Sequence, residues 1–286
     1  MTDAVPGFDV ITLSHGGRTH EVYLAGAGPA VIVVHEMPGL HPGVTAFGQR
    51  LVDAGYRVYL PSLFGRPGAP FTGGETARSM WQVCVSREFV LLADRTPPVV
   101  TWLRALAARA HAECGGPGVG VVGMCFTGGF ALAMAVEPAV LAPVLSQPGV
   151  PFGVTAATRA ALGLDPADLA GIKARASDGL CVLGLRFSAD RGSPAERFAT
   201  LRRELGDNFE AVVIDSSPGN PHGIRRNAHS VLTLELVDTP GHPTRAALDP
   251  SAPRSYAPRT TRSSAPITAA PCPSRCRSGR TATAST

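Results

Sequence analysis

A cysteine occupies the place in this chain where residue type and spacing most clearly indicate chemistry. Cys125 stands in the run GMCFTGG at positions 123–129, between an apolar run at 119–123 and an alanine-rich run at 130–136. This pattern predicts a strand, a tight turn and a helix, so Cys125 would lie at a helix N-terminus, where partial positive charge favours an anion. Serine is the usual residue at such a nucleophile elbow. Cysteine there predicts thiolate attack on an acyl group, although an inert buried thiol is the common alternative.

A cysteine nucleophile needs a base and an acid that orients the base. Asp190 follows a predicted strand at 180–187 and precedes a predicted helix at 194–205, which would place its carboxylate at the carboxyl end of a strand. The alternative is that Asp190 caps the helix or pairs with Arg191. We favour the catalytic interpretation because Asp190 lies between Cys125 and the later histidines in the chain.

Two histidines, His222 and His229, follow a predicted strand at 209–214 and compete for the role of base. The order nucleophile, acid, histidine is that of the α/β-hydrolase arrangement. His222 stands between proline and glycine residues that could hold it as an ordinary loop residue. We therefore favour His229 as the base and keep His222 as the alternative.

Glu36 comes just after a predicted strand at 30–34, so its turn would face the same rim of the sheet as Cys125. The backbone N–H groups of Met37 and Phe126 could then form an oxyanion hole, in which each donor typically contributes roughly 10²–10³ in rate. The alternative is a glutamate in a surface loop.

The elements that would position these residues alternate between strands and helices. The predicted strands are a hairpin at 9–14 and 20–25 and runs at 30–34, 56–60, 119–123, 139–145, 180–187 and 209–214, and the predicted helices are 45–54, 75–93, 98–111, 130–136 and 194–205. This alternation predicts an α/β fold with a mostly parallel central sheet, helices on both faces and right-handed crossovers. Catalytic groups should gather at the carboxyl ends of the strands.

The last part of the chain differs in composition from the rest. Residues 250–286 contain six arginines and no acidic residue, whereas the remaining chain has 20 basic and 22 acidic residues. The net charge of +4 is therefore a property of the tail, and no stripe of basic and aromatic residues indicates nucleic-acid binding. We expect one domain over residues 1–249 and a disordered, low-complexity basic tail over 250–286. An altered C-terminus, such as a frameshift, would explain the change in composition.

Targeting and metal-binding signals are missing from the sequence. No apolar run approaches the ~20 residues of a membrane span, and the N-terminus has no secretory signal pattern, so we expect a cytoplasmic protein without a membrane partner. The six cysteines lack close-paired metal spacing apart from Cys272 and Cys276, which have no nearby histidine ligands. We expect no metal and no cofactor. The oligomeric state is not readable from the sequence.

Three segments make the chain similar to the dienelactone hydrolase family of α/β-hydrolases: VVHEMPGL at 33–40, GYRVYLPSLFG at 55–65 and GMCFTGG at 123–129. The resemblance covers roughly residues 8–249. It departs from the family pattern at Ser62, where the family often has aspartate, and at Thr127, where it usually has glycine. A β-branched residue at Thr127 requires the helix to pack slightly further from the strand.

The resemblance implies an α/β-hydrolase fold with a central eight-stranded sheet, acting on a small-molecule lactone or ester without a cofactor. It implies that Cys125 attacks the carbonyl, that His229 moves the proton and that Asp190 fixes the imidazole tautomer, through a thioester that water hydrolyses. It also implies that Glu36 holds the resting thiol by a hydrogen bond.

Two other classes of protein remain open at this point. One is a degenerate protein that keeps the hydrolase fold as a binding module without turnover. The other is the group of amidotransferase-like and protease-like enzymes that also place cysteine on an elbow. These typically carry a histidine beside the nucleophile, whereas Phe126 follows Cys125 here.

Overall fold

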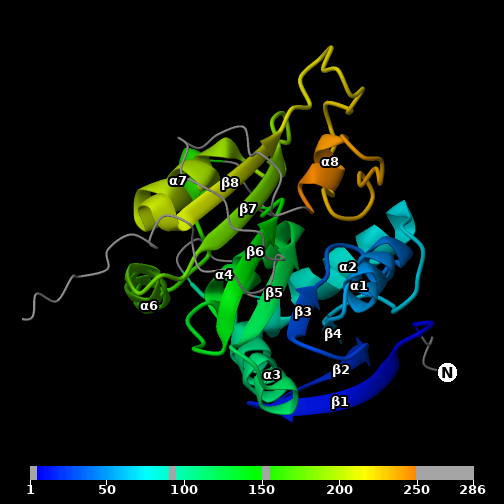
Figure 1. The fold of residues 1–286 in the computed structure, drawn as a ribbon, viewed down its shortest axis with the longest axis vertical. Coiled ribbons are helices and arrows are strands. Elements are labelled where there is room, and N and C mark those ends of the chain that lie inside the picture. The colour runs from blue at the N-terminus through cyan, green and yellow to red at the C-terminus, as the bar shows by residue number, and fades with distance from the viewer. Residues whose placement is uncertain (1–4, 90–94, 150–154, 249–286) are drawn as a thin grey trace, which may run out of the picture.

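An eight-stranded sheet runs through the molecule (Figure 1). The structure is a computed structural model that describes residues 5–89, 95–149 and 155–248. Its strands are β1 (Asp9–His15), β2 (Arg18–Ala25), β3 (Ala30–Val34), β4 (Arg57–Ser62), β5 (Val119–Met124), β6 (Val140–Ser146), β7 (Val182–Phe187) and β8 (Phe209–Ile214). They lie in the order β1-β2-β4-β3-β5-β6-β7-β8.

The sheet is mostly parallel, as the alternation of strands and helices predicted. Strands β1, β2 and β4 pair antiparallel, and β4, β3, β5, β6, β7 and β8 pair parallel in that order. β3 and β5 are entirely buried, which explains why they read as continuous apolar runs rather than alternating ones. Parallel pairing brings the carboxyl ends of β3, β5, β6, β7 and β8 to one edge of the sheet.

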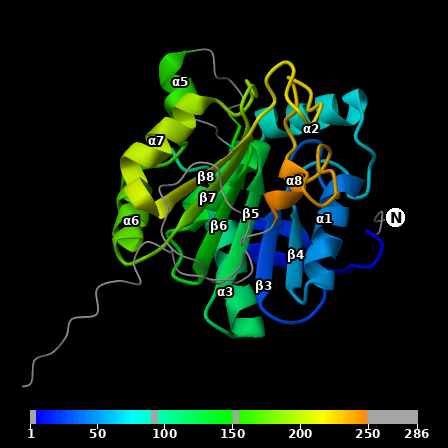
Figure 2. The same cartoon turned by 45° about the horizontal axis from the view of Figure 1, so that its top comes forward.

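Helices cover both faces of the sheet (Figure 2). They are α1 (Pro42–Asp53), α2 (Gly73–Val85), α3 (Val99–Cys114), α4 (Gly128–Met134), α5 (Ala156–Ala160), α6 (Pro166–Ser177), α7 (Ala195–Leu205) and α8 (Pro243–Ala246), with 3-10 turns η1 (Arg87–Phe89), η2 (Cys125–Thr127) and η3 (Gly206–Asn208). None of the helices in the described ranges is long and apolar enough to cross a membrane.

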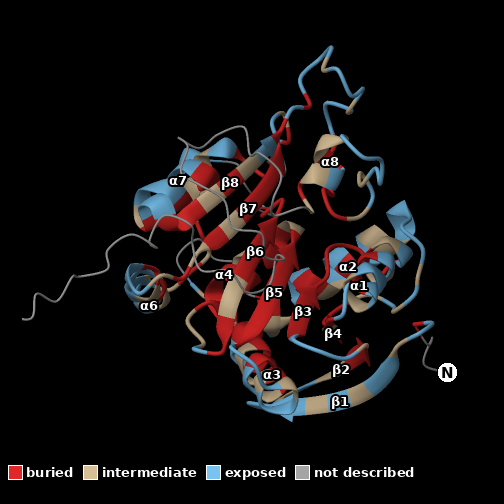
Figure 3. Cartoon of the chain, in the orientation of Figure 1, coloured by how far each residue is buried: buried red, intermediate tan, exposed pale blue. Residues whose placement is uncertain are grey.

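Two buried clusters hold these layers together (Figure 3). On one face, Ile32 of β3 belongs to the same cluster as Leu103 of α3 and Phe130 of α4. On the other face, Val33 of β3 belongs to the same cluster as Phe47 of α1. Neighbouring residues of one strand thus serve opposite cores, as a strand covered on both faces requires.

The predicted helices differ from the observed ones at the end of α2 and at helices that the sequence analysis left out. The helix predicted over 75–93 ends at Val85, because Ser86 adopts an extended backbone and its hydroxyl accepts the N–H of Glu88; residues 90–94 lie outside the described part. Helices α5 and α6 were not predicted. The expected tail over 250–286 also lies outside the described residues.

The joint between β5 and α4 accommodates Thr127 by hydrogen bonding. The Thr127 hydroxyl is fully buried, accepts the N–H of Met124 at 2.9 Å, and lies 2.7 Å from the Met124 carbonyl and 3.0 Å from the Val34 carbonyl. The close approach is made possible by Gly123, where a Cβ atom would come within 2.3 Å of the Thr127 carbonyl oxygen and 2.8 Å of the Ala131 Cβ. A β-branched side chain therefore fits because its hydroxyl ties the turn to β3.

We expect Thr127→Val to destabilise the protein without changing side-chain volume. Valine leaves the buried N–H of Met124 without its acceptor, which costs about 1–3 kcal/mol. Urea denaturation measures this loss in the free energy of unfolding. Thr45→Val, which removes an exposed hydroxyl contact to the Pro42 carbonyl, is the control and should change stability by less than about 0.5 kcal/mol. Equal stability of both variants would show that the Thr127 contacts do not hold the joint.

Candidate active site

Cys125 lies at the junction of β5 and η2 with φ of +56°. This is the left-handed region, which non-glycine residues rarely occupy and which strains the backbone. Among the described residues only Gln147, at the end of the neighbouring strand β6, shares this feature, with φ of +37°. Both residues with a strained backbone therefore lie at the carboxyl edge of the sheet. The strain at Cys125 is that of a nucleophile elbow, in which a sharp strand-to-helix turn presents the side chain at the top of the sheet.

The structure brings His229 to Asp190. The His229 Nδ1 lies 2.7 Å from the Asp190 Oδ2, and the Cys125 side chain is near enough to His229 to act on its pKa. The other Asp190 oxygen, Oδ1, accepts the N–H of Gly192 at 2.8 Å. Asp190 does not cap helix α7, whose N-cap residue is Pro194. The three side chains thus form a continuous row from the carboxylate to the thiol.

The loop that carries Asp190 is held by a buried arginine. Arg186, on β7, donates from Nε to the Ser193 carbonyl at 2.8 Å and from Nη2 to the carbonyls of Ser188 and Asp190 at 3.2 and 3.3 Å. These bonds fix the turn that follows β7. Burial lowers the pKa of Arg186, while the nearby Asp190 charge opposes this change.

His229 is placed to carry a proton. Burial favours its neutral form, but hydrogen bonds to Asp190 and Cys125, together with their negative charges, outweigh burial and raise the pKa of His229 to about 11. The imidazole is therefore protonated at neutral pH, with Asp190 on one side and the thiol group on the other.

His222 is not part of this row. It is exposed in the loop after β8, and its ring packs edge-on against His242 with 5.3 Å between centroids. The structure places His229 and not His222 beside the acid and the cysteine.

Glu36 is a buried carboxylate with four side-chain partners. Its Oε2 accepts the Ser230 hydroxyl at 2.7 Å and the Gln147 amide at 3.0 Å, and its Oε1 accepts the Thr233 hydroxyl and lies 3.4 Å from the His41 Nε2. None of these four partners is Cys125. Although burial alone would raise the pKa of Glu36, the hydrogen bonds from His41, Thr233 and Ser230 outweigh it and lower that pKa. Glu36 therefore stays charged and ties the loop of His229 to the end of β3.

Gln147 is a site residue that the sequence analysis missed. Its amide donates to Glu36, and its Oε1 accepts the Val231 N–H at 3.2 Å and the Ser146 hydroxyl. Gln147 directly follows β6, so the rule that singled out Glu36 and Asp190, a polar residue at a strand's carboxyl end, would also have found it.

Gly149 lies against Cys125. Its N–H donates to the Cys125 carbonyl at 2.9 Å. A Cβ atom on Gly149 would lie 3.2 Å from the Cys125 Sγ and 3.3 Å from the Phe126 backbone nitrogen. This point is within reach of both the Cys125 sulfur and the Phe126 backbone nitrogen. Glycine leaves that point open.

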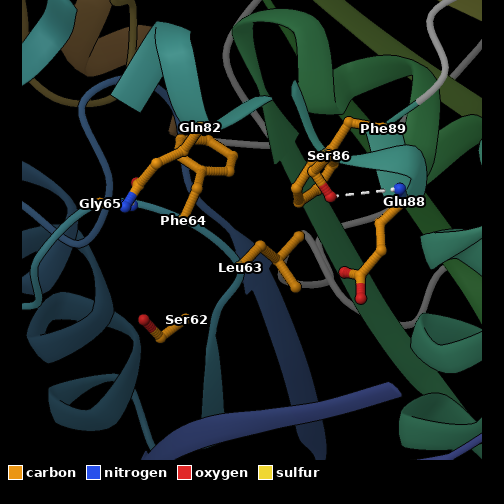
Figure 4. A pocket seen from close by; sticks show the side chains of 8 residues that line it. All are labelled: Ser62, Leu63, Phe64, Gly65, Gln82, Ser86, Glu88 and Phe89. Carbon is orange, nitrogen blue, oxygen red and sulfur yellow. Dashed lines mark hydrogen bonds between the residues drawn. The ribbon is translucent and has the colours of Figure 1, made fainter. Parts of the chain in front are cut away.

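A pocket of about 340 Å³ lies beside the elbow, between the end of β4 and α2–η1 (Figure 4). Its lining residues are Ser62, Leu63, Phe64, Gly65, Gln82, Ser86, Glu88 and Phe89. Phe64 also stacks on Phe126, with 5.4 Å between ring centroids. Neither Cys125, Asp190 nor His229 lines this pocket, so it neighbours the row of side chains rather than containing it.

Possible metal ligands do not gather within the described ranges: no group of three or more histidine, cysteine or acidic side chains there could hold a metal ion.

The sheet order, the strained cysteine elbow and the helices on both faces define an α/β-hydrolase fold. Two solved structures share it, with 20% and 15% sequence identity. A dienelactone hydrolase from Anabaena variabilis matches with a TM-score of 0.53, over 84% of this chain and 93% of that one. A cold-adapted esterase from an Arctic intertidal metagenomic library matches with a TM-score of 0.51, over 78% and 92%.

The family model for the dienelactone hydrolase family matches residues 21–231, and the chain belongs to that family. It is a hydrolase of the carboxylic-ester or lactone class. No curated protein matches the chain.

We expect Gly149→Ala to lower ester turnover by roughly 100-fold, because the new Cβ displaces the carbonyl from the thiol by about 1 Å. The measurement is kcat/KM for p-nitrophenyl acetate. Gly129→Ala in α4 is the control, since its Cβ would meet only the Leu162 carbonyl oxygen at an ordinary 3.5 Å. Full activity of Gly149→Ala would mean that the reacting group sits elsewhere.

The raised pKa of His229 also predicts that the free energy of unfolding depends on pH. Because its pKa is raised from 6.5 to about 11 in the folded protein, its contribution is fully present below pH 6.5 and is lost as pH rises towards 11. We expect the stability difference between the wild type and His229→Gln to shrink steadily across this window. Urea denaturation at pH 6, 8 and 10, paired with His222→Gln as control, measures it. A difference that is constant with pH would contradict the raised pKa.

Proposed function

We propose that this protein hydrolyses a small-molecule carboxylic ester or lactone through a Cys125–His229–Asp190 triad and a thioester intermediate. The observation that carries the proposal is the 2.7 Å contact between His229 Nδ1 and Asp190 Oδ2, together with the strained elbow that holds Cys125 near the same imidazole. A cysteine on a strained elbow, next to a protonated histidine oriented by a carboxylate, has the geometry of an activated acyl-transfer nucleophile.

In the first half-reaction, the Cys125 thiolate attacks the carbonyl carbon and forms a C–S bond. The resulting oxyanion collapses, the C–O bond breaks, and the alkoxide leaving group takes the proton from His229 Nε2, since Nδ1 faces Asp190. The enzyme is left as a thioester with neutral His229.

In the second half-reaction, neutral His229 takes a proton from water as the water oxygen attacks the thioester. The tetrahedral intermediate breaks its C–S bond, which releases the carboxylic acid and restores the thiolate beside protonated His229. Asp190 accepts a hydrogen bond from Nδ1 throughout and so keeps the imidazole in one orientation.

The backbone N–H groups of Met37 and Phe126 are the proposed oxyanion hole. Supporting this assignment, the open point beside Gly149 lies 3.3 Å from the Phe126 nitrogen. Met37 follows Glu36 at the end of β3, next to the elbow strand β5. A hydrogen bond that the resting Cys125 thiol donates to Glu36 stays a prediction, as does a cytoplasmic location.

We expect Cys125→Ala to abolish hydrolysis of p-nitrophenyl acetate and Asp190→Asn to lower kcat by roughly 10³–10⁴-fold, because asparagine no longer holds the imidazole in the required tautomer. Both variants should retain the circular dichroism spectrum of the wild type. His222→Ala, which alters an exposed histidine outside the row, is the matched control and should keep full activity.

Two outcomes would contradict the triad. Undiminished turnover in Cys125→Ala would remove the nucleophile from the mechanism. A folded wild-type protein that turns over neither esters nor lactones would instead favour a binding module that keeps the hydrolase fold.

A further inference from the structure

Arg197, on α7, is a buried cation beside the active site. Only 6% of the residue is exposed, and its Nη1 donates to the Gly149 carbonyl at 2.9 Å. Within residues 5–89, 95–149 and 155–248, no carboxylate lies within ion-pair distance of Arg197, and its buried Nε has no hydrogen-bond partner. A buried charge without a compensating anion is costly, so a fold that keeps one needs a reason to do so.

Arg186, the other buried arginine of the site, has more hydrogen-bond partners than Arg197. Arg186 bonds three carbonyl oxygens and lies near the charge of Asp190. Within the described residues the Arg197 side chain makes a single hydrogen bond, and that bond goes to the residue that lies against Cys125. Gly149 bridges the two groups, since its carbonyl accepts from Arg197 and its N–H donates to the Cys125 carbonyl.

The Cys125 sulfur lies close to the residue that Arg197 bonds. Arg197 donates to the Gly149 carbonyl at 2.9 Å, and a Cβ atom on Gly149 would be only 3.2 Å from the Cys125 Sγ. We propose that Arg197 is a charge-stabilising residue that favours the thiolate of Cys125 and, through Gly149, fixes the backbone beside it. This inference rests on the proposed function, because it assigns a second cation to the same nucleophile.

Charged groups face Cys125 from several elements. Protonated His229 comes from the loop after β8 and Arg197 from α7, and both favour the thiolate. Asp190, after β7, and Glu36, after β3, are anions that oppose it. Asp190 is bonded by His229, and Glu36 is bonded by its own four partners, which weakens their effect on the sulfur. Arg197 therefore acts with His229 rather than replacing it.

The test is the rate of alkylation of Cys125 by iodoacetamide as a function of pH, followed by mass spectrometry of the Cys125 peptide. Arg197→Met removes the charge and should move the midpoint of this profile upward by about one pH unit. Arg197→Lys keeps the charge without the arginine geometry and should leave the midpoint near that of the wild type. Arg197→Gln serves as a second neutral variant if methionine prevents folding.

Arg175→Met is the matched control. Arg175 is a partly buried arginine that donates to the carbonyls of Ala135, Glu137 and Pro138, away from the cysteine, and its loss should not move the midpoint. A folded neutral variant of Arg197 with the wild-type midpoint would overturn the proposal and leave Arg197 a structural role only.

The readout separates this inference from the proposed function, because alkylation needs no ester substrate. If Arg197→Met shifts the alkylation midpoint but the wild type hydrolyses no ester, the role of Arg197 is supported and the hydrolase mechanism is contradicted. If the wild type hydrolyses esters but Arg197→Met keeps the wild-type midpoint, the hydrolase mechanism stands and the role of Arg197 is contradicted.

Discussion

The active site depends on one buried carboxylate. Glu36 stands at the end of β3 and receives hydrogen bonds from Ser230, Thr233 and Gln147. Ser230 adjoins His229, so the loop after β8, which has no regular secondary structure of its own around the histidine, is fixed to the sheet by this carboxylate. Because a buried charge is tolerated only when it is well hydrogen-bonded, the network holds together as a unit. Glu36 thereby sets the position of His229, the proposed base, through Ser230 rather than by direct contact.

Two strained backbone conformations, and the hydrogen bonds that hold them, lie along the carboxyl edge of the sheet. Cys125 and Gln147 carry unfavourable backbone conformations, and each is held by bonds to neighbouring elements. Thr127 ties the elbow to β3, and Gly149 joins the elbow to the loop after β6. The cost of such conformations persists only where surrounding structure determines them. The nucleophile is therefore presented by a framework that is already formed before substrate binds.

The sequence predicted the sheet, the family and the candidate triad because these leave local signals. Apolar runs mark buried strands, and Cys125, Asp190 and Glu36 each follow one. Most contacts of Glu36 could not be predicted, since three of its four side-chain partners, Gln147, Ser230 and Thr233, lie 111 to 197 residues away in the chain. Arg197 was missed for a related reason: a charged residue in a helix normally reads as solvent-exposed, and only packing of α7 against the loop after β6 reveals its burial. The choice between His222 and His229 likewise needed the path of the loop.

The central claim is that Cys125 carries the acyl group during turnover. The most direct measurement is intact-protein and peptide mass spectrometry after acid quenching of the enzyme with p-nitrophenyl acetate, using Asp190→Asn to slow the reaction. The account predicts one acetyl group on the Cys125 peptide, removed by neutral hydroxylamine and missing in Cys125→Ala. Turnover without acetylation of Cys125, or acetylation at another residue, would contradict it.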